Sequence, residues 1–495
     1  MPGAVASSLL FLSLFALESS AVQFTFQVAQ PKAATANSAN NNLINTDNLR
    51  YSTNITISGN VVNVLIDTGS SDLWVMPLGD IGVGAFSLDG GQFAVSSQAY
   101  LFGQTEAGEE ADFEEGHFGI LGLGFDTQGA SQINTAVQQA QGATATWGQS
   151  VLTNIFAQNP DSSDYIGIAL SRTGDQEGTA DGSLTIAERL RGRGCGALRW
   201  IRFRLGGTKI NWPSTITAAP AGKNIVLLDT GTTNILMPQT QVNAIYSTIP
   251  GAVLSPNSNI PLVQFSETNN VWVVPCTAQV DVVATFAGQD FAIHPLDVTD
   301  MQVLTTPDGK HNFTVCVNSF TDIGTIAQGE TDALFGDSFL RNVYTAFDFG
   351  TGGPTKGTPF VQMLSTTDAT KSAADLIAVR AVNMQNMPPE LSPVDLVRVF
   401  NGTLNAADAV PVAALSASVI SSAIAADAAA STTAAGGSAS TTAGSSTPAT
   451  TGSSGSGSSG STNASDGKSN GAGMSFVPQM GVVVGALLLG LSTLL

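Results

Sequence analysis

Basic residues are scarce in this chain of 495 residues. Eighteen Lys and Arg stand against thirty-eight Asp and Glu, so the net charge is −20, although only 11% of the residues are charged. A surface this acidic disfavours binding to nucleic acid or to anionic lipid. It suits a protein that works in an acidic medium.

Histidine and cysteine are equally rare, with three of each. The histidines His117, His294 and His311 do not have the spacing of a metal site, and the chain has neither a G-x-S-x-G motif nor a phosphate-binding loop. We therefore predict no metal and no cofactor, and no serine nucleophile of the hydrolase-elbow type.

The first 21 residues have the features of a secretory signal peptide. A short apolar core at residues 9–17 is followed by small residues up to Ala21, where we predict cleavage. Residues 22–50 are then expected to be a linker or a short pro-segment.

The C-terminal residues 471–495 predict a glycosylphosphatidylinositol anchor. Small residues near Asn470 and a polar spacer precede an apolar run at 480–495, which is short for a membrane span. A C-terminal membrane helix is the alternative. Either reading attaches the protein to a membrane at the cell surface or cell wall.

Residues 363–470 are rich in Ser, Thr, Ala and Gly, a composition that cannot bury a core. We expect a disordered, O-glycosylated stalk there. Four N-x-S/T sequons, which are candidates for N-glycosylation, begin at Asn54, Asn312, Asn401 and Asn463.

The globular part is expected to be residues 51–362 and mostly β. Short runs such as "VVNVLI", "NIVLL" and "QVDVVATF" are rich in β-formers and are separated by Gly, Pro and Asn, whereas helical periodicity is weak.

Two similar motifs lie 162 residues apart in this part. Asp67-Thr68-Gly69-Ser70 and Asp229-Thr230-Gly231-Thr232 each follow an apolar run and precede another that ends in Met-Pro. A lone D-T-G is an ordinary turn sequence. Each copy here also has a later echo, "FGILGLGF" and "ALFGDSFL", so the repeat predicts two related β lobes.

Paired carboxylates explain why both copies would keep an aspartate. Two carboxyl groups brought together cannot both ionise, so one holds a proton while the other is charged. Such a pair can activate a water as base and protonate a carbonyl as acid. Asp67 and Asp229 are therefore the candidate catalytic residues, and the glycines permit tight turns close to the partner loop.

At these residues the chain resembles the pepsin-type aspartic proteases, most closely the fungal secreted and surface-anchored members. The resemblance rests on "DTGSSDLWV", "LLDTGTTNILMP", "ADGSLTI" and "LFGDSFLRNVYTAFDFG" and covers residues 51–362. It implies a bilobed β fold, with an N-lobe at about 51–190 and a C-lobe at about 207–362. A substrate cleft would lie between the lobes, and the substrates would be peptides or proteins.

The resemblance also implies supporting roles. Ser70 and Thr232 would hydrogen-bond the catalytic carboxylates, Thr68 and Thr230 would lock the two loops together, and Gly122 and Gly336 would lie beside them. A disulfide between Cys276 and Cys316 is similar in placement to a bridge of the family's C-lobe. Because both D-T-G motifs lie in one chain, we expect a monomer.

Two stretches depart from the family's pattern. Six arginines fall within residues 189–204, around Cys195, which we interpret as a segment foreign to the domain rather than a functional basic patch. The interval from Asp67 to Gly122 is also 52 residues shorter than that from Asp229 to Gly336. The missing part would hold the hairpin that covers the substrate, and we do not assign its tyrosine to Tyr100.

Two hypotheses follow. The first is a secreted, surface-anchored aspartic endopeptidase that is active at acidic pH, favoured by the two intact motifs. The second is a catalytically impaired, protease-like surface glycoprotein with a binding or structural role, favoured by the shortened first lobe.

Overall fold

The computed structural model describes most of residues 39–425. The described ranges are 39–75, 81–88, 91, 93–102, 116–125, 131–172, 182–187, 201–205, 208–217, 219–261, 269–326, 328–350, 359–422 and 424–425. The predicted signal peptide, the low-complexity stretch after residue 425, the anchor signal and Asn463 lie outside them.

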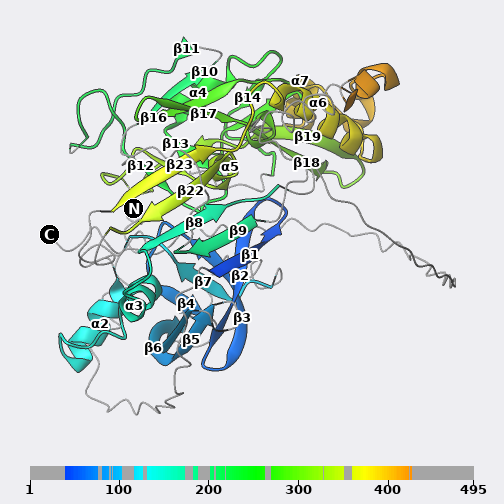
Figure 1. The fold of residues 1–495 in the computed structure, drawn as a ribbon. Coiled ribbons are helices and arrows are strands. Elements are labelled where there is room, and N and C mark those ends of the chain that lie inside the picture. Colours follow the sequence, from blue (N-terminus) through cyan, green and yellow to red (C-terminus); the bar gives the residue numbers. More distant parts are fainter. Residues whose placement is uncertain are drawn as a thin grey trace, which may run out of the picture.

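The expectation of a mostly β fold is confirmed, and the chain forms two lobes (Figure 1). The elements of the N-lobe are β1 (Ala39–Thr46), β2 (Arg50–Ile57), β3 (Asn60–Asp67), β4 (Leu73–Val75), β5 (Ile81–Leu88), β6 (Phe93–Phe102), β7 (Gly119–Gly122), α2 (Gln132–Gln141), α3 (Val151–Gln158), β8 (Tyr165–Ala169) and β9 (Gly182–Ile186).

The C-lobe has more helix than the N-lobe, and its own sheets have four strands each. Its elements are β10 (Ile201–Leu205), β11 (Thr208–Lys209), β12 (Val226–Leu228), β13 (Ile235–Met237), α4 (Gln239–Tyr246), β14 (Val253–Ser255), β15 (Val271–Val274), β16 (Val282–Phe286), β17 (Gln289–Ile293), η2 (Pro295–Asp297), β18 (Thr299–Thr305), β19 (Asn312–Asn318), β20 (Thr321–Asp322), β21 (Ala333–Phe335), α5 (Asp337–Leu340), β22 (Val343–Asp348), β23 (Phe360–Ser365), α6 (Ser372–Asn383), η3 (Met384–Asn386), α7 (Pro393–Phe400) and η4 (Ala406–Asp408).

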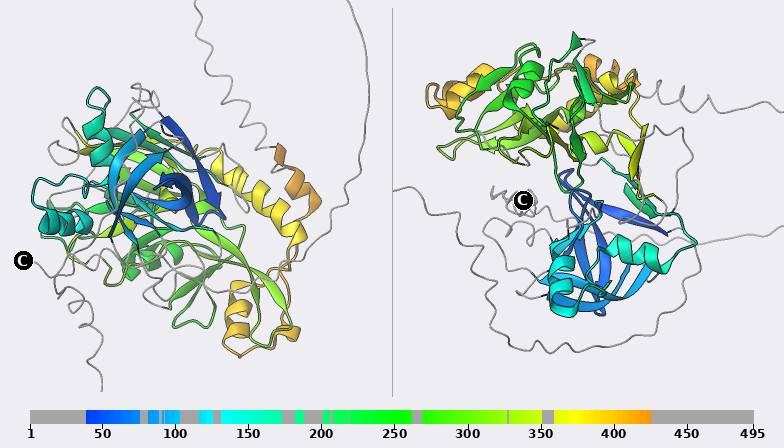
Figure 2. Two further views of the ribbon diagram at one scale, coloured as in Figure 1. Left: turned by 90° about the horizontal axis from the view of Figure 1, so that it is seen from below. Right: turned by 90° about the vertical axis from the view of Figure 1, so that its left-hand side faces the viewer.

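One long sheet connects the lobes. Its eleven strands run in the order β23-β22-β8-β9-β1-β2-β3-β7-β4-β6-β5. The late strand β22 pairs antiparallel with β8 of the N-lobe, so residues 343–348 and 165–169 lie side by side although they are far apart in the sequence. The view from the side shows the two lobes on either side of this connection (Figure 2).

Burial explains why the strands that lead to the D-T-G motifs form where they do. The last four residues of β3, Val64–Asp67, are all buried, and the main apolar core includes Ile66 and Leu121 of the N-lobe together with Leu228 and Phe335 of the C-lobe. β-Branched and aliphatic residues fit such two-sided burial in a parallel strand pair.

The predicted linker at residues 22–50 must be corrected at its end. Strand β1 pairs with β9 and β2, and Leu43 is buried in the main core. The alternation in "NNNLINT" is weak because asparagine dominates it, which is why composition suggested a linker. The folded domain thus begins before Tyr51.

The predicted stalk also begins too early at residue 363. Helices α6 and α7 follow β23 and pack on the C-lobe, where Leu391, Leu396 and Phe400 join a second core cluster with Val271 and Phe313. Apolar residues at i, i+3 and i+4 spacing along α7 provide the buried face. A folded extension therefore precedes the low-complexity stretch.

Part of the arginine-rich stretch belongs to the domain, which corrects its interpretation as a foreign segment. Residues 201–205 form β10, which pairs antiparallel with β16 and β11. In the sequence these residues alternate between apolar residues and arginine, the period of two that is typical of a strand. Residues 188–200, including Cys195, lie outside the described ranges.

The disulfide and three of the sequons can be located. Cys276 and Cys316 are joined by a disulfide, and both residues are buried in the C-lobe. Asn54, Asn312 and Asn401 are exposed, so they can accept a glycan, although their occupancy stays a prediction.

Candidate active site

The first D-T-G motif begins where a buried strand ends. β3 runs parallel to β7, with Asp67 opposite Gly122, and the chain leaves the sheet directly after Asp67. The N–H of Leu123 donates to the Asp67 carbonyl over 2.7 Å. The strand pair therefore fixes the backbone of the aspartate.

The second motif has the same construction. β12 runs parallel to β21, with Leu228 opposite Phe335, and the N–H of Asp229 donates to the Phe335 carbonyl over 3.0 Å. β4 and β13 then return antiparallel to β7 and β21, respectively. Each aspartate thus stands at the start of a loop that crosses between two strands.

The two loops approach each other so closely that they need glycine. A Cβ atom added at Gly69 would lie 2.7 Å from Cγ of Asp229, and one added at Gly231 would lie 2.7 Å from Oδ1 of Asp67 and 3.2 Å from Oδ1 of Asp229. Real Cβ atoms do not come this close to a carboxyl group. The structure therefore brings the two aspartates together.

Each carboxyl group is held by its own loop. Oδ1 of Asp67 accepts from the Gly69 N–H at 2.7 Å, and Oδ2 accepts from the Ser70 hydroxyl. Oδ1 of Asp229 accepts from the Gly231 N–H at 2.8 Å, and Oδ2 from the Thr232 hydroxyl at 2.5 Å. The matched bonds fix the orientation of both groups.

Thr68 and Thr230 connect the loops reciprocally. The Thr68 N–H donates to Oγ1 of Thr230 at 3.1 Å, and the Thr230 N–H donates to Oγ1 of Thr68 at 3.0 Å. Each hydroxyl in turn donates over 2.9 Å to a carbonyl of the partner strand, at Leu228 and Ile66. These four buried hydrogen bonds hold the aspartates in register.

Burial and a neighbouring charge shift the pKa of one member of the pair, Asp229. Burial, the nearby charge of Asp67 and a hydrogen bond that protonated Asp229 donates to that carboxylate raise the pKa of Asp229 well above its usual range, against the lowering effect of Thr232 and Gly231. The raised pKa favours the protonated form of Asp229. The pair can carry one proton and one negative charge, as an acid–base catalyst requires.

Gly122 and Gly336 allow the loops to pack against the strands. A Cβ atom at Gly122 would lie 2.5 Å from the Asp72 nitrogen, and one at Gly336 would lie 1.9 Å from the Thr232 carbonyl oxygen. Their places beside the two motifs agree with the apolar echoes in the sequence.

A third carboxyl group, which the sequence analysis missed, lies behind the second loop. Asp337 is 1% exposed, and its N–H donates to the Thr232 carbonyl at 2.8 Å. Burial raises the pKa of Asp337 well above its usual range, and the charge of Asp229 adds to this, whereas Arg341 opposes it. Its signal in the sequence was the aspartate after Gly336 in "ALFGDSFL".

A buried ionic cluster near this carboxyl connects the lobes. Arg172 of the N-lobe and Arg341 each bind Asp297, with N–O distances of 2.7 Å, and Arg341 also donates to the Asn48 carbonyl at 2.7 Å. Burial alone would raise the pKa of Asp297, but the two arginines outweigh it and lower the pKa to about 2. The cluster thus stays ionised in acid.

Tyr100 lies in β6, inside the N-lobe. Its side chain is 5% exposed in the main core, and its hydroxyl lies 3.3 Å from Oγ of Ser58. β6 pairs with β5 and β4, so Tyr100 is a core residue of the hairpin β5–β6. The neighbouring segments 76–80 and 103–115 lie outside the described ranges.

No group of three or more His, Cys, Asp and Glu side chains in the described part of the chain could hold a metal ion. No helix of that part is long and apolar enough to cross a membrane.

Comparisons with known proteins relate the chain to a family of proteases. A family model described as eukaryotic aspartyl protease matches residues 79–353, a range that includes Asp229 and begins after Asp67. The chain is 27% identical over 194 residues to the "Probable aspartic-type endopeptidase CTSD" of Arthroderma otae, covering 38% of this chain and 45% of that protein.

Two further relatives are fungal. Identity is 26% over 238 residues to "Aspartic-type endopeptidase ctsD" of Aspergillus fumigatus, covering 47% of this chain and 42% of the relative. Identity is 25% over 368 residues to "Vacuolar protease A" of Arthroderma otae, covering 64% of this chain and 80% of that protein. The chain thus spans less than half the length of the first two relatives.

Proposed function

Because the chain belongs to the eukaryotic aspartyl protease family, we propose that it is an aspartic endopeptidase that hydrolyses peptide bonds with Asp67 and Asp229. The observation that carries the proposal is the juxtaposition of these two buried carboxyl groups on matched loops. The names of the fungal relatives are consistent with it.

The proposed reaction uses one water and one shared proton. The Asp67 carboxylate removes a proton from the water as its oxygen attacks the carbonyl carbon of the peptide bond. Asp229, which keeps its proton because of its raised pKa, donates it to the carbonyl oxygen. As the tetrahedral intermediate collapses, one of its hydroxyl groups returns a proton to Asp229 and the carbonyl re-forms. The C–N bond breaks, and the leaving nitrogen takes up the proton held by Asp67.

This proposal predicts activity in acid. Once the pH rises above the pKa of Asp229, both carboxyl groups carry a charge and no proton remains for the carbonyl oxygen. We expect proteolysis to peak at acidic pH and to vanish near neutrality. Peptides or proteins would be the substrates.

The location of the protein is a further part of the proposal. The apolar N-terminal core, the sequons and the apolar C-terminal run support a secreted glycoprotein attached to the cell surface by a glycosylphosphatidylinositol anchor. Release from membranes by a phosphatidylinositol-specific phospholipase C tests this. Retention alongside a released control protein would favour a membrane helix.

The decisive experiment on activity compares three substitutions in the full chain. Asp67→Asn and Asp229→Asn should each lower peptide hydrolysis by about 100- to 10,000-fold, because one carboxyl group cannot act as both acid and base. Asp161→Asn changes an exposed carboxylate in a turn of the N-lobe and serves as the control. Activity of either dyad variant within tenfold of wild type would reject the proposal.

The alternative function is a catalytically impaired binding or structural protein. It is favoured by the 52-residue shortening between Asp67 and Gly122, where the family carries the hairpin that covers the substrate. Loss of such a lid weakens water exclusion and substrate positioning more than binding. A chain that binds a statine-type inhibitor but does not cleave peptides would support this alternative.

The same alternative can be tested by adding a lid. A Tyr-bearing hairpin inserted between Met76 and Asp80, before β5 begins at Ile81, should then increase hydrolysis strongly at acidic pH. Gly84 is a poor insertion point because it pairs in β5, and a Cβ atom there would lie 1.9 Å from Oγ of Ser58.

A further inference from the structure

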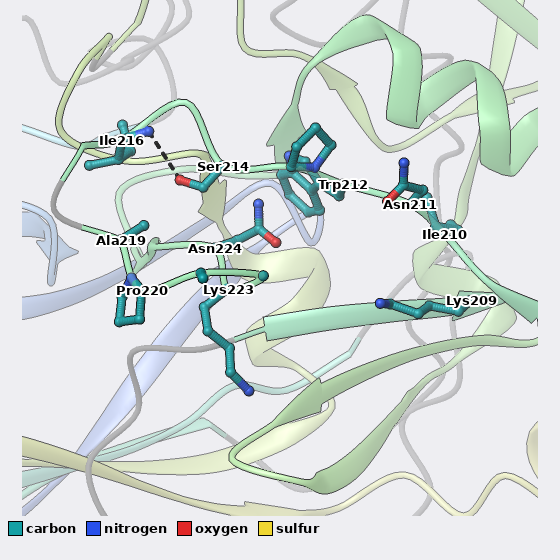
Figure 3. Close-up of a pocket in the computed structure, with 13 residues that line it drawn as sticks. Lys209, Ile210, Asn211, Trp212, Ser214, Ile216, Ala219, Pro220, Lys223 and Asn224 are labelled. Carbon is teal, nitrogen blue, oxygen red and sulfur yellow. Dashed lines mark hydrogen bonds between the residues drawn. The ribbon is translucent and has the colours of Figure 1, made fainter.

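A pocket unconnected with the paired aspartates lies in the C-lobe, in the segment between β11 and β12. Its volume is about 280 Å³. Ile210, Trp212, Pro213, Ile216, Ala219 and Pro220 form most of its apolar lining, and Figure 3 shows the polar residues Lys209, Lys223 and Asn224 among them. The site therefore combines apolar side chains with a larger share of polar surface.

The wall of the pocket is held by a buried carboxylate. Asp332 accepts from the Ser214 hydroxyl at 2.7 Å and from the N–H groups of Thr215 and Ile225 at 3.0 and 2.8 Å. The Ile216 N–H donates in turn to Oγ of Ser214 at 3.0 Å. The shape of the pocket is thus fixed before any ligand arrives, and three donors compensate the charge of Asp332.

Asn224 provides an unused donor at this pocket. Its side chain is 3% exposed, and within the described ranges its amide nitrogen Nδ2 has no hydrogen-bond partner. A buried donor without a partner loses its hydration on folding, so a ligand oxygen that accepts from Nδ2 would recover that loss.

Two lysines give the pocket a positive charge in a strongly acidic protein. Lys209 is exposed and Lys223 half-buried, and in the part that the structure describes neither ammonium group pairs with a carboxylate. They are two of only eighteen basic residues against a net charge of −20. Their presence on one pocket favours an anionic ligand.

We propose that this pocket binds a small amphiphilic carboxylate. The apolar body of the ligand would lie against Trp212 and Ile216, and its carboxylate would accept a hydrogen bond from Nδ2 of Asn224. The positive charges of Lys209 and Lys223 would attract it. The carboxyl end of a short apolar peptide has this chemistry. The proposal does not depend on proteolysis, because no residue of the aspartate pair lines the pocket.

Calorimetric titration of the full chain tests the proposal with two matched probes. N-acetyl-L-phenylalanine should bind with a Kd of about 1 mM or tighter, and its neutral amide should bind at least about tenfold more weakly, because the amide offers no charge to the lysines. Inorganic sulfate, which has charge but no apolar body, should also bind more weakly than the carboxylate probe.

Side-chain variants assign the binding to this pocket. Lys209→Gln and Lys223→Gln should each weaken the carboxylate probe about two- to fivefold, the range of an exposed ion pair. Asn224→Ala should weaken it further. Lys310→Gln, at an exposed lysine of the β18–β19 turn, is the control and should leave the Kd unchanged. Thermal unfolding of each variant verifies that it is folded. Should Asn224→Ala fail to fold, the Kd values of the two lysine variants test the proposal on their own.

Several outcomes would overturn the proposal. Equal affinity for the acid and the amide, or folded lysine variants with the wild-type Kd, would remove the role of charge. Sulfate that binds as tightly as the carboxylate would remove the role of the apolar wall. Displacement of the probe by a statine-type inhibitor would place it at Asp67 and Asp229, so failure here leaves the proposed protease function untouched.

Discussion

The two D-T-G loops are almost identical in their internal bonds, yet they lie in different surroundings. In each lobe the loop follows a parallel strand pair, and Thr68 and Thr230 exchange bonds of nearly equal length. The residue after the neighbouring glycine differs, because Leu123 is an apolar core residue whereas Asp337 is a buried carboxyl group. The symmetric bonds thus fix the joint position of the two aspartates, and the asymmetry places a third buried carboxyl group beside the second loop.

A second difference lies five residues after each aspartate. Asp72 of the N-lobe accepts from the Ser131 hydroxyl at 2.5 Å and from the first N–H groups of α2, at 3.0 Å for Gln132. Such a carboxylate stabilises the start of a helix. The backbone bond at this position is the same in both lobes, because the Gly122 N–H donates to the Asp72 carbonyl over 3.0 Å and the Gly336 N–H donates to the Asn234 carbonyl over 3.1 Å. The N-lobe loop thus differs in that the Asp72 side chain also connects it to α2.

We expect the largest loss of unfolding free energy from a substitution in the buried ionic cluster that connects the two lobes. Arg172→Met removes one of two arginines from buried Asp297, and a charge left without its partner costs about 3–5 kcal/mol of unfolding free energy. Urea unfolding at pH 5 measures the change. Arg398→Met removes an ion pair whose arginine side chain is 50% exposed and should cost almost nothing. Equal effects of the two variants would show that the cluster does not connect the lobes.

The C-terminal helices should contribute nearly as much to the C-lobe. Leu396→Ala on α7 deletes a side chain that is 1% exposed and should lower the unfolding free energy by about 2–5 kcal/mol. Val394→Ala on the same helix changes a residue that is 52% exposed and is the matched control. If both variants unfold like wild type, residues 366–412 do not belong to the folded C-lobe and the lobes are more alike than we describe.

Sequence predicts best what is local and repeated. The β class, the two D-T-G loops and their glycines follow from short motifs with matched flanks, because a buried strand followed by a tight turn needs only neighbouring residues. The structure brings those residues together, although their catalytic roles stay predictions. Helix α7 has a clear apolar period, but the Ala- and Ser-rich context of the segment hid it.

Long-range polar contacts are what the sequence could not show. Arg172 and Asp297 are 125 residues apart, and nothing in the residues around either one predicts the partner. The same applies to Asp337, which becomes distinctive only when burial is known. Strand β1 was missed because its strand pairing, rather than its own β-propensity, makes it a strand.

The symmetry of the loops predicts equal effects of two substitutions. Thr68→Val and Thr230→Val each remove a hydroxyl that donates to one backbone carbonyl and accepts from one backbone N–H. Each should cost about 1–3 kcal/mol and lower peptide hydrolysis to a similar degree, since buried partners lose their bonds. Thr305→Val, which removes an exposed bond to Asn312, is the control. A large inequality between the first two would show that one lobe alone fixes the dyad.

The smallest expected effect is on the pH dependence of stability, because the ionisable groups buried in the two lobes lose their contributions at different pH values. Burial, and then the charge of Arg50, lower the pKa of His117 in the N-lobe from 6.5 to about 4. Because the unfolded chain binds that proton more readily, the stability from neutral His117 is present above about pH 6.5 and is lost as the pH falls through about 4. Asp297 also has a lowered pKa, but it stabilises the fold in its charged form. With a pKa of about 2 in the fold and 3.8 ordinarily, its contribution to stability is present above about pH 3.8 and is lost as the pH falls through about 2.

The test is the thermal midpoint of wild type and His117→Asn between pH 7 and pH 3. Asparagine can still donate toward Asn63, the partner of His117 Nδ1 at 2.9 Å, but it does not titrate. The variant should therefore lose part of the fall in midpoint between about pH 6.5 and 4, whereas above pH 7 the two curves should run parallel. Identical pH profiles throughout would mean that the N-lobe is as resistant to acid as the C-lobe, because the difference in their buried ionisable groups would then have no consequence for stability.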